Sequence, residues 1–399
     1  MTHNRFVQSI KLNGLLSFSP DSEPFELQPL NVLIGPNGAG KSNLIEAFEL
    51  LSSIPVDFAS VIRDGGTTPG DWIWKGKNDK NVAQIEVVIG PSPTKRPLRY
   101  KLAFIEAAQR LEIVDEAIED DKPVKAGASD VPFYYRFYGG RPVINIIAGG
   151  ANGKYSEIKL PLESLLPNQS VLSQRKDPDL YPELTWTGRA FAEILTFREW
   201  RIGRSADLRR PQPASDDIYQ LRSDSRNLAL VLNEIRNRRE TEIDALIRRF
   251  LPRFRRMFTR IEGGTVQFFI YEDGLNDPIP SSRLSDGTIR FLAILAALLT
   301  PKPPRLLCIE EPELGIHPDA LGLLAEMLVG ASERMQLIVT THSDVLISAL
   351  SNHVNSVVVC ENNGNGTVLQ RLDAERLAPW LEKYRLGDIW RIGEIGGNL

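Results

Sequence analysis

The sequence predicts an α/β fold, in which a mixed sheet with flanking helices is joined to an antiparallel β lobe and a helical middle segment. Three observations support this. An apolar run at 32–34 leads through a glycine-rich loop into a helix, β-type runs occupy much of 83–159, and helical stripes occupy part of 160–264. We therefore divide the chain into an N-terminal part (1–160), a helical lobe (161–264) and a C-terminal part (265–399).

Residues 30–42 read LNVLIGPNGAGKS, which is the G-x-x-x-x-G-K-S pattern of a P-loop between a strand and a helix. The glycines allow backbone N–H groups to converge on a phosphate, and the helix adds the positive end of its dipole. Lys41 supplies charge to the β- and γ-phosphates, and the Ser42 hydroxyl is placed to bind Mg²⁺. The loop is predicted to bind a nucleoside triphosphate. The predicted binding positions are Gly35, Asn37, Gly38, Ala39, Gly40, Lys41, Ser42 and Asn43.

Length and composition set the broad class. The chain has 399 residues and a formal net charge of −4, so two or more lobes are expected and no global basic field indicates nucleic acid. Cys308 and Cys360 lie in apolar runs and are expected to be buried free thiols in a reducing compartment. No signal sequence is recognisable, and no apolar run approaches about 20 residues. We therefore expect a cytoplasmic protein without membrane spans.

In the first part of the chain, short β-type runs precede the P-loop strand, and between 83 and about 159 the β-type runs separated by turn residues predict an antiparallel meander. The expected strands are 6–12, 15–18, 25–27, 84–89, 98–105, 111–114, 133–138 and 143–147. The acidic segment 115–121, DEAIEDD, is expected to be a solvated loop tip.

The middle of the chain is expected to be helical and rich in arginine. Two apolar stripes recur at helical spacing, at Leu228, Val231, Leu232 and Ile235, and at Ile243, Leu246, Ile247, Phe250 and Phe254. One arginine group is Arg236, Arg238, Arg239, Arg248, Arg249, Arg253, Arg255, Arg256 and Arg260, and another is Arg198, Arg201, Arg204, Arg209 and Arg210. Two interpretations remain open: these arginines form the solvated faces of amphipathic helices, or they follow the phosphates of a nucleic acid.

Three further motifs follow in the C-terminal part. LSDG at 284–287 opens an apolar helix that Ser285 or Asp286 could cap, and Ser285 with the Gly287 amide forms a second anion site. A buried strand leads into Glu310 and Glu311, and adjacent carboxylates in such a place are expected to serve a metal or a reacting water. Another strand ends at His342, which is placed to donate to a γ-phosphate. The histidine spacing indicates no zinc site.

Taken together, GPNGAGKS, LSDGTIRF, LLCIEEPELGIHP and TTHSD resemble the Walker A, signature, Walker B with D-loop, and H-loop series of an ABC-type ATPase. Within that superfamily, the chain is similar to the SMC-related RecF-like and OLD-like branch, often labelled AAA family ATPases. The resemblance implies an ABC-type P-loop ATPase head with a helical insert. Two departures stand out. Glu310 replaces the usual Walker B Asp, which leaves open a metal contact through water, and LSDGT replaces the LSGGQ of transporter subunits.

The resemblance also implies the roles of the site residues. Two heads would sandwich two ATP molecules, so that Lys41 and the P-loop glycines hold phosphates within one chain while Ser285 and Gly287 close on the γ-phosphate from the other. Ser42 and Glu310 would serve Mg²⁺. Lys41, Glu311 and His342 are the expected catalytic residues: Glu311 polarises the attacking water and His342 senses the γ-phosphate.

Two classes of function are compatible with these motifs. The first, favoured by the LSDGT signature and the arginines, is a homodimeric, DNA-associated ATPase switch in DNA repair or phage defence. The second is the nucleotide-binding subunit of a membrane transporter. OLD-like nucleases carry a Toprim domain after the ATPase, and residues 343–399 are too short for one, so we expect a separate nuclease-type effector protein. The apolar tail 386–399 is expected to dock on the core of its own chain, with a partner surface as the alternative.

Overall fold

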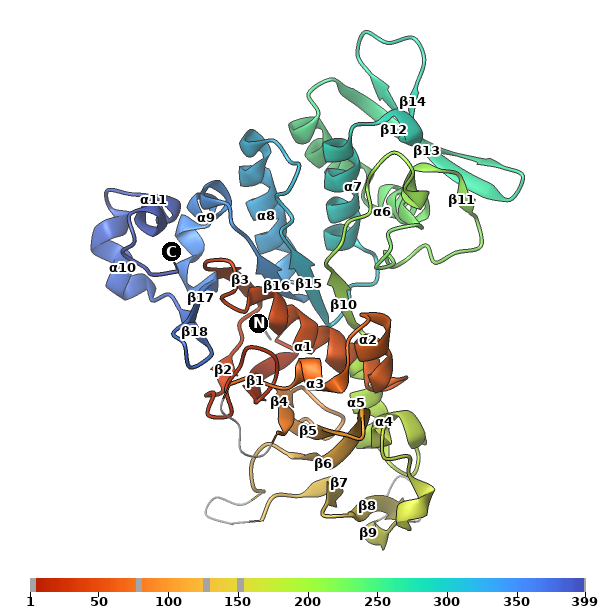
Figure 1. The fold of residues 1–399 in the computed structure, drawn as a ribbon. Coiled ribbons are helices and arrows are strands. Elements are labelled where there is room, and N and C mark those ends of the chain that lie inside the picture. The colour runs from red at the N-terminus through yellow and green to blue at the C-terminus, as the bar shows by residue number, and fades with distance from the viewer. Residues whose placement is uncertain (1–4, 77–80, 125–129, 149–153, 398–399) are drawn as a thin grey trace.

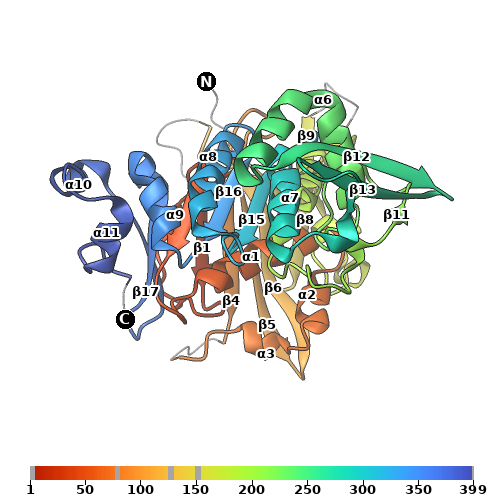
Figure 2. The ribbon, with the colours of Figure 1, turned by 90° about the horizontal axis from the view of Figure 1, so that it is seen from above.

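The computed structural model of the protein describes residues 5–76, 81–124, 130–148 and 154–397. Three sheets organise these residues (Figure 1). An eight-stranded antiparallel sheet forms the lower lobe in that view, a six-stranded sheet lies in the middle, and a small antiparallel sheet lies at the upper right. Seen from above, the small sheet projects sideways from the rest of the molecule (Figure 2). The mixed α/β fold predicted from the sequence is confirmed.

The antiparallel lobe is built almost entirely from the first part of the chain. Its strand order is β2-β1-β4-β5-β6-β7-β8-β9. The strands are β1 (Val7–Asn13), β2 (Phe25–Glu26), β4 (Ala83–Ile89), β5 (Leu98–Ala107), β6 (Arg110–Asp120), β7 (Phe133–Tyr138), β8 (Arg141–Ala148) and β9 (Lys154–Lys159). The meander predicted between 83 and 159 is therefore correct. Of the earlier runs, 15–18 forms isolated bridges instead of a strand, from Leu15 to Phe18 and to Ile73.

The acidic segment 115–121 is not a solvated loop, and this prediction was wrong. Residues 115–120 belong to β6, and Glu116, Glu119 and Asp120 are buried. The four carboxylates of 115–120 meet donors that neighbouring elements supply. The contacts run from Lys101 to Asp115, from Tyr100, Ser170 and the Val171 amide to Glu116, from Arg99 and Arg136 to Glu119, and from Arg96 and Tyr134 to Asp120. These hydrogen bonds and ion pairs make burial of the four carboxyl groups tolerable.

The six-stranded sheet has the order β10-β15-β16-β3-β17-β18, and only its last strand is antiparallel. Its strands are β3 (Leu30–Ile34), β10 (Ile194–Phe197), β15 (Leu306–Glu310), β16 (Gln336–Thr340), β17 (Val357–Asn362) and β18 (Thr367–Arg371). The strand that enters the P-loop, β3, thus lies between two strands from the C-terminal part of the chain.

Both faces of the six-stranded sheet are covered, as a parallel sheet requires. Val32 packs in the core that contains the apolar faces of α6, α7 and α8, whereas the next residue, Leu33, packs in the core shared by α1 and the antiparallel lobe. Cys308 and Cys360 are buried free thiols, as expected.

Helices cover the sheets and connect them. They are α1 (Lys41–Ser53), α2 (Phe58–Asp64), α3 (Pro69–Trp72), α4 (Val171–Gln174), α5 (Pro182–Ala192), α6 (Leu228–Phe250), α7 (Asp286–Leu299), α8 (Leu321–Ser332), α9 (Asp344–Ala349), α10 (Ala374–Leu381) and α11 (Leu386–Arg391). Short 3-10 turns lie at Leu162–Ser164, Asp207–Arg209, Ser281–Arg283, Pro318–Ala320 and Ser351–Ser356. Within the described ranges, no helix is both long enough and apolar enough to cross a membrane.

The middle segment is helical in α4, α5 and α6, but it also contributes strands. β10 pairs in parallel with β15 at the edge of the six-stranded sheet. β12 (Phe254–Glu262) pairs with β13 (Thr265–Glu272), which also contacts β11 (Gln212–Pro213) and β14 (Ile279–Pro280). Phe254, which was predicted to continue a helical stripe, begins β12, because Pro252 excludes the helical hydrogen bond at that point.

The tail after residue 385 docks on its own core, as expected. Ile389 and Trp390 are buried within α11, and Ile395 joins the same hydrophobic core. The Gly397 amide donates to Glu361 Oε1 at 2.8 Å. Residues 398 and 399 lie outside the described residues.

Candidate nucleotide-binding and hydrolysis site

The P-loop joins β3 to α1 through three glycines with positive φ. The φ angles are 146° at Gly35, 78° at Gly38 and 99° at Gly40. Side chains are also excluded sterically at both ends, since an added Cβ would lie 2.2 Å from the Cys360 carbonyl oxygen at Gly35 and 2.1 Å from Thr367 Oγ1 at Gly40. The loop conformation therefore depends on glycine both for its dihedral angles and for the close approach of β17 and β18.

Contacts distant in sequence hold the end of the P-loop that enters α1. Thr367 Oγ1, at the start of β18, lies 2.9 Å from the Ala39 carbonyl oxygen and 2.7 Å from Ser17 Oγ. The Thr367 amide also donates to the Ser17 carbonyl at 2.8 Å. The loop is thus braced from two sides, which favours a preformed phosphate cradle.

Lys41, the first residue of α1, is folded back into the loop. Its Nζ donates to the carbonyl oxygens of Gly35 at 2.7 Å and Pro36 at 3.0 Å, and the residue is buried. Burial lowers the pKa of the Lys41 ammonium, and the negative charges of Glu311 and Glu310 offset only part of this effect. An anionic ligand in the loop would favour the charged form.

Ser42 and Glu310 meet at the carboxyl end of β15. Ser42 Oγ donates to Glu310 Oε1 across the start of α1. Both are oxygen donors, which Mg²⁺ prefers, and phosphate oxygens and water commonly complete its octahedron. These residues therefore fit a magnesium ion. Although Glu310 replaces the usual Asp, its longer side chain reaches Ser42 directly.

Arg198 also contacts Glu310. The sequence placed Arg198 in an arginine group but did not predict this contact. Arg198 follows β10, and its Nε lies 3.2 Å from Glu310 Oε2, while its other nitrogens reach Glu46 at 2.7 Å and Glu49 at 3.3 Å on α1. Burial disfavours the charged guanidinium, but the carboxylates of Glu46 and Glu310 outweigh it and raise the pKa of Arg198. Arg198 neutralises a carboxylate cluster beside the P-loop.

Glu311 and His342 face each other across the ends of β15 and β16. His342 Nε2 lies 3.6 Å from Glu311 Oε1. Glu311 has a positive φ of 44°, and its amide donates to the Thr340 carbonyl oxygen at 3.1 Å, with Thr340 Oγ1 at 3.2 Å. A left-handed glutamate is sparsely populated and typical of functional sites, so this geometry marks Glu311 as a candidate reacting group.

Glu313 links these two strand ends and was also missed. Its Oε1 accepts from Thr341 Oγ1 at 2.6 Å and from the His342 amide at 2.9 Å. These bonds orient the segment that carries His342. The repeated glutamates of EEPE were a signal for this role, but the sequence did not indicate which of them turns toward β16.

The LSDG segment lies at the start of α7. Ser285 is the N-cap, and its Oγ accepts from the Thr288 amide at 3.1 Å. Asp286 instead meets Arg209, a fully buried residue that also donates to the Leu284 carbonyl at 2.5 Å. A Cβ on Gly287 would lie 2.6 Å from the Gly315 carbonyl oxygen. Gly287 is therefore required for the close contact between the LSDG segment and the backbone at Gly315.

The predicted site residues fall into two groups. Lys41, Ser42, Glu310, Glu311 and His342 come together at the P-loop, where Asn37 and Gly38 are exposed. No hydrogen bond or ion pair among the described residues joins Ser285 or Gly287 to the P-loop. Two arginines considered for nucleic acid binding, Arg198 and Arg209, instead hold the site and the LSDG segment from within.

This fold and this set of groups define the class: a P-loop ATPase with an ABC-type head. The chain belongs to the family described as "AAA domain, putative AbiEii toxin, Type IV TA system", whose model matches residues 30–133 and 147–348. The resemblance stated from the motifs is thereby confirmed, and membership of this family makes the protein an ATPase.

Three individual proteins illustrate the relationship. The Old nuclease of Escherichia phage P2 is 31% identical over 129 residues, which are 29% of this chain and 21% of that protein, so the match spans about a fifth of the relative's length. The SmcHead bound to the C-winged helix domain of ScpA has a TM-score of 0.57 at 12% identity and covers 93% of this chain and 99% of its own. The SMC head domain from Thermotoga maritima has a TM-score of 0.46 at 13% identity, covering 92% and 99%.

Proposed function

We propose that two copies of this chain close around ATP and form a switch that acts on nucleic acid, in DNA repair or in defence against phage. One observation carries the proposal: the groups that suit phosphate and magnesium gather at the P-loop, while the exposed Ser285 stands on a separate segment. A second copy would bring Ser285 and Gly287 to the γ-phosphate. The similarity to a phage nuclease supports a nucleic-acid setting. We propose in addition that a separate nuclease-type effector acts with this chain.

In this proposal, each residue has one task. Lys41 and the loop amides bind the phosphates, Ser42 and Glu310 hold Mg²⁺, and the bound ion offsets phosphate charge. Glu311 accepts a proton from the attacking water, and His342 donates to the γ-phosphate. Positioning and charge neutralisation then lower the barrier to phosphoryl transfer.

Complementation between variants tests the composite site. Ser285→Arg should leave ATP binding intact but block closure and turnover, whereas Lys41→Ala should lose ATP binding. In a mixed dimer of the two variants, one of the two sites carries neither defect, so mixing should restore part of the turnover. If confirmed mixed dimers recover no turnover at any ratio, the two-copy site is wrong.

The effector part of the proposal has its own test. Purified protein with ATP and Mg²⁺ or Mn²⁺ should hydrolyse ATP and leave plasmid and single-stranded DNA intact. DNA cleavage that persists through purification and disappears on mutation of this chain would contradict a separate nuclease.

A further inference from the structure

The solvent-facing side of β12 and β13 carries a continuous stack of two arginines and three aromatic rings. In order, Arg256 lies over Tyr271 at 4.6 Å, Tyr271 stacks with Phe258 at 5.5 Å, Phe258 with Phe269 at 5.2 Å, and Arg260 lies over Phe269 at 5.1 Å. We call these five residues the Arg–aromatic ladder. The two ring pairs are tilted by only 26° and 15°, so their planes are nearly parallel.

The two-residue period of the strands places the ladder on one face. Met257, Phe268 and Ile270 point the other way and are buried in the core that contains α6. Phe258 and Phe269 are directly opposite in the antiparallel register, as are Arg256 and Tyr271. The aromatic residues are half-buried and both arginines are exposed, so core packing does not account for this row of rings.

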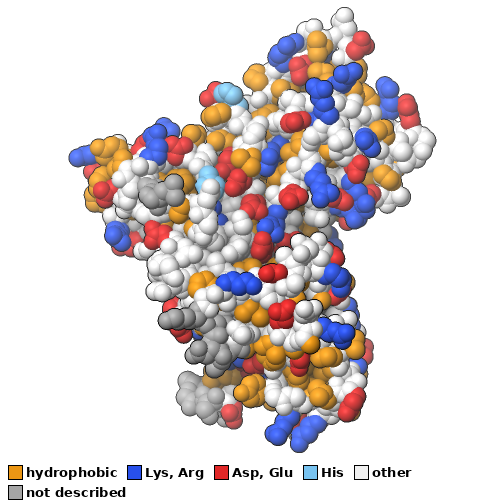
Figure 3. Space-filling view, in the orientation of Figure 1, with side chains coloured by type: hydrophobic (Ala, Val, Ile, Leu, Met, Phe, Trp, Pro, Cys, Tyr) orange, Lys and Arg blue, Asp and Glu red, His pale blue; other side chains and the backbone are white. Residues whose placement is uncertain are grey.

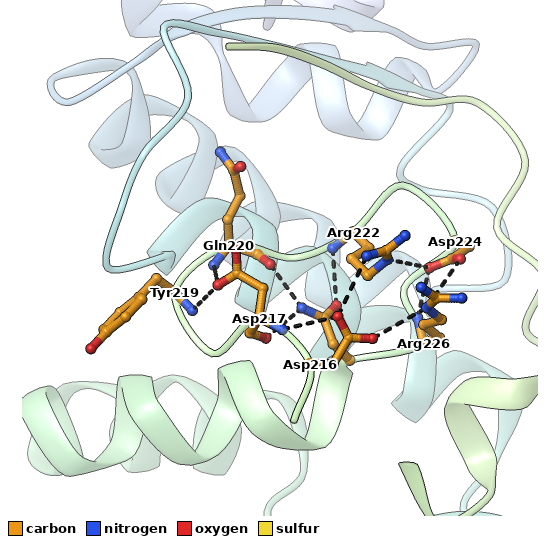
Figure 4. A network of polar contacts seen from close by, with 8 residues as sticks. Asp216, Asp217, Tyr219, Gln220, Arg222, Asp224 and Arg226 are labelled. Carbon is orange, nitrogen blue, oxygen red and sulfur yellow. Dashed lines mark hydrogen bonds and ion pairs between the residues drawn. The ribbon is translucent and has the colours of Figure 1, made fainter. Parts of the chain in front are cut away.

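The ladder arginines are held by rings rather than by carboxylates. Within the described residues, Arg256 has no carboxylate within 4.0 Å, and the nearest carboxylate of Arg260 is that of Glu262 at 3.8 Å. Arg222 and Arg226, in the loop before α6, show the contrast: Asp216 accepts from both, at 3.4 and 3.2 Å (Figure 4). In the space-filling view, basic side chains are frequent on the lobe that carries α6 and β12–β14 (Figure 3).

This arrangement matches the chemistry of an unpaired nucleic acid strand. A guanidinium placed over a ring can direct its N–H donors to phosphate, and its planar group can also stack with a base. Arg256 and Arg260 are four residues apart on one strand, about 13 Å, which is long enough to meet successive nucleotides. A duplex offers phosphates but hides the faces of its bases, so it would use only part of the ladder.

We propose that the Arg–aromatic ladder of β12 and β13 binds single-stranded nucleic acid, with bases stacking at its arginine ends and phosphates on the guanidinium N–H groups. The inference rests on the nucleic-acid part of the proposed function and gives it a site and a substrate class. Within the arginine-rich region, it selects Arg256 and Arg260 because these two lie over the stacked rings. Arg249, by contrast, is paired with Glu326 at 2.7 Å, and Arg253 bonds to the Asp273 carbonyl oxygen.

Two double variants of the full chain separate stacking from charge. Fluorescence anisotropy would measure binding of a labelled single-stranded DNA, the same sequence as RNA, and the DNA duplex, over a range of salt. Arg256→Gln with Arg260→Gln should weaken single-strand binding at least about tenfold and lower the salt slope by about 1.4, that is, about 0.7 for each lost phosphate contact. Arg256→Lys with Arg260→Lys should keep the slope yet lose about tenfold in affinity, because lysine lacks the planar group.

Arg249→Gln is the matched control, since it removes one positive charge from the same lobe outside the ladder, and it should bind like wild type. ATP turnover and melting temperature should be unchanged in both double variants, which excludes misfolding. If wild type binds single strands and the double variants bind equally well, the ladder inference fails while the proposed function stands. If wild type binds no nucleic acid at low salt, the nucleic-acid part of the proposed function fails, and the inference with it. Loss of a protein partner with normal nucleic acid binding would make the ladder a protein-docking surface and overturn the inference.

Discussion

The carboxylates of β6 and those at the end of β15 differ in how fully neighbouring groups pair with them. In β6, Asp115 to Asp120 lie within an antiparallel strand, and each of the four carboxylates has donors from neighbouring elements. At the end of β15, Glu310 contacts Ser42 and Arg198, and Glu311 Oε1 lies 3.6 Å from His342 Nε2. The carboxyl end of a parallel strand leaves acidic groups incompletely paired, and there a metal or substrate can use them.

The largest difference in ATP turnover is expected between two Glu→Gln variants, one just after β15 and one in β6. Glu311→Gln keeps the shape but removes the base, so ATP turnover should fall at least about 100-fold while ATP binding persists and a closed dimer accumulates. Glu112→Gln, on an exposed position of β6, should leave turnover unchanged. Steady-state ATP hydrolysis and size-exclusion chromatography with ATP would measure this. Turnover of Glu311→Gln within a fewfold of wild type would remove Glu311 from its assigned role.

The buried carboxyl of β6 should control stability rather than activity. Burial raises the pKa of Glu116 from 4.5 to about 7. The pKa of Glu116 is higher in the folded state than in the unfolded state, so its protonated form stabilises the fold. This contribution is full below about pH 4.5 and is lost as the pH rises through about 7. Glu116→Gln should therefore gain stability relative to wild type between about pH 5 and 8, on the order of 2 kcal/mol. Urea unfolding of wild type and Glu116→Gln at about pH 5 and pH 8 measures this. A stability difference between the two proteins that does not change with pH would contradict the prediction.

Arg198, which follows β10 and contacts Glu310 at the end of β15, should give a smaller effect. Arg198→Gln leaves Glu46, Glu49 and Glu310 without their shared positive charge, and should cost about 1–2 kcal/mol because the site is partly exposed. Mg²⁺ should restore part of this loss by neutralising Glu310. Thermal melting with and without Mg²⁺ should thus show a larger ion-dependent shift in the variant than in wild type. Equal shifts would mean that the ion and Arg198 do not share a carboxylate.

The smallest effect is expected for the ion pair between Lys101 on β5 and Asp115 on β6. Lys101 Nζ lies 2.6 Å from Asp115 Oδ2, with both side chains partly exposed. Lys101→Gln should cost about 0.5 kcal/mol, and salt should reduce the difference. Chemical unfolding at low and high salt checks this. A cost as large as that of Arg198→Gln would remove the distinction between the two strands.

The same comparison shows what the sequence could reveal. The residues at the P-loop and the end of β15 were predictable, because phosphate and metal chemistry require particular residue types at short, fixed spacings. The carboxylates of β6 were not, because their partners, such as Arg136 and Ser170, lie far along the chain. With the partners hidden, an acidic run looked like a solvated loop.

Arginine posed the same difficulty within one region. Arg198, Arg209 and Arg256 have the same chemistry in the sequence, yet the first holds a carboxylate cluster, the second is buried beneath the LSDG segment and the third stacks on a ring. The four-residue strand β10, which delivers Arg198, is too short for periodicity to identify. Local pattern therefore located the arginines, but their roles depended on the tertiary fold.

The central position of β3 has a consequence for synthesis of the chain. The P-loop strand pairs with β16 and β17, and Asn31 donates to the Leu337 carbonyl across 306 positions. At about 5–20 residues per second, a ribosome would deliver those partner strands roughly 15–60 s after β3 has been made. The antiparallel strands β4 to β9 are consecutive and can pair during that interval. The nucleotide-binding loop is consequently among the last parts of the molecule to acquire its shape, which delays ATP binding until the C-terminal strands have been made.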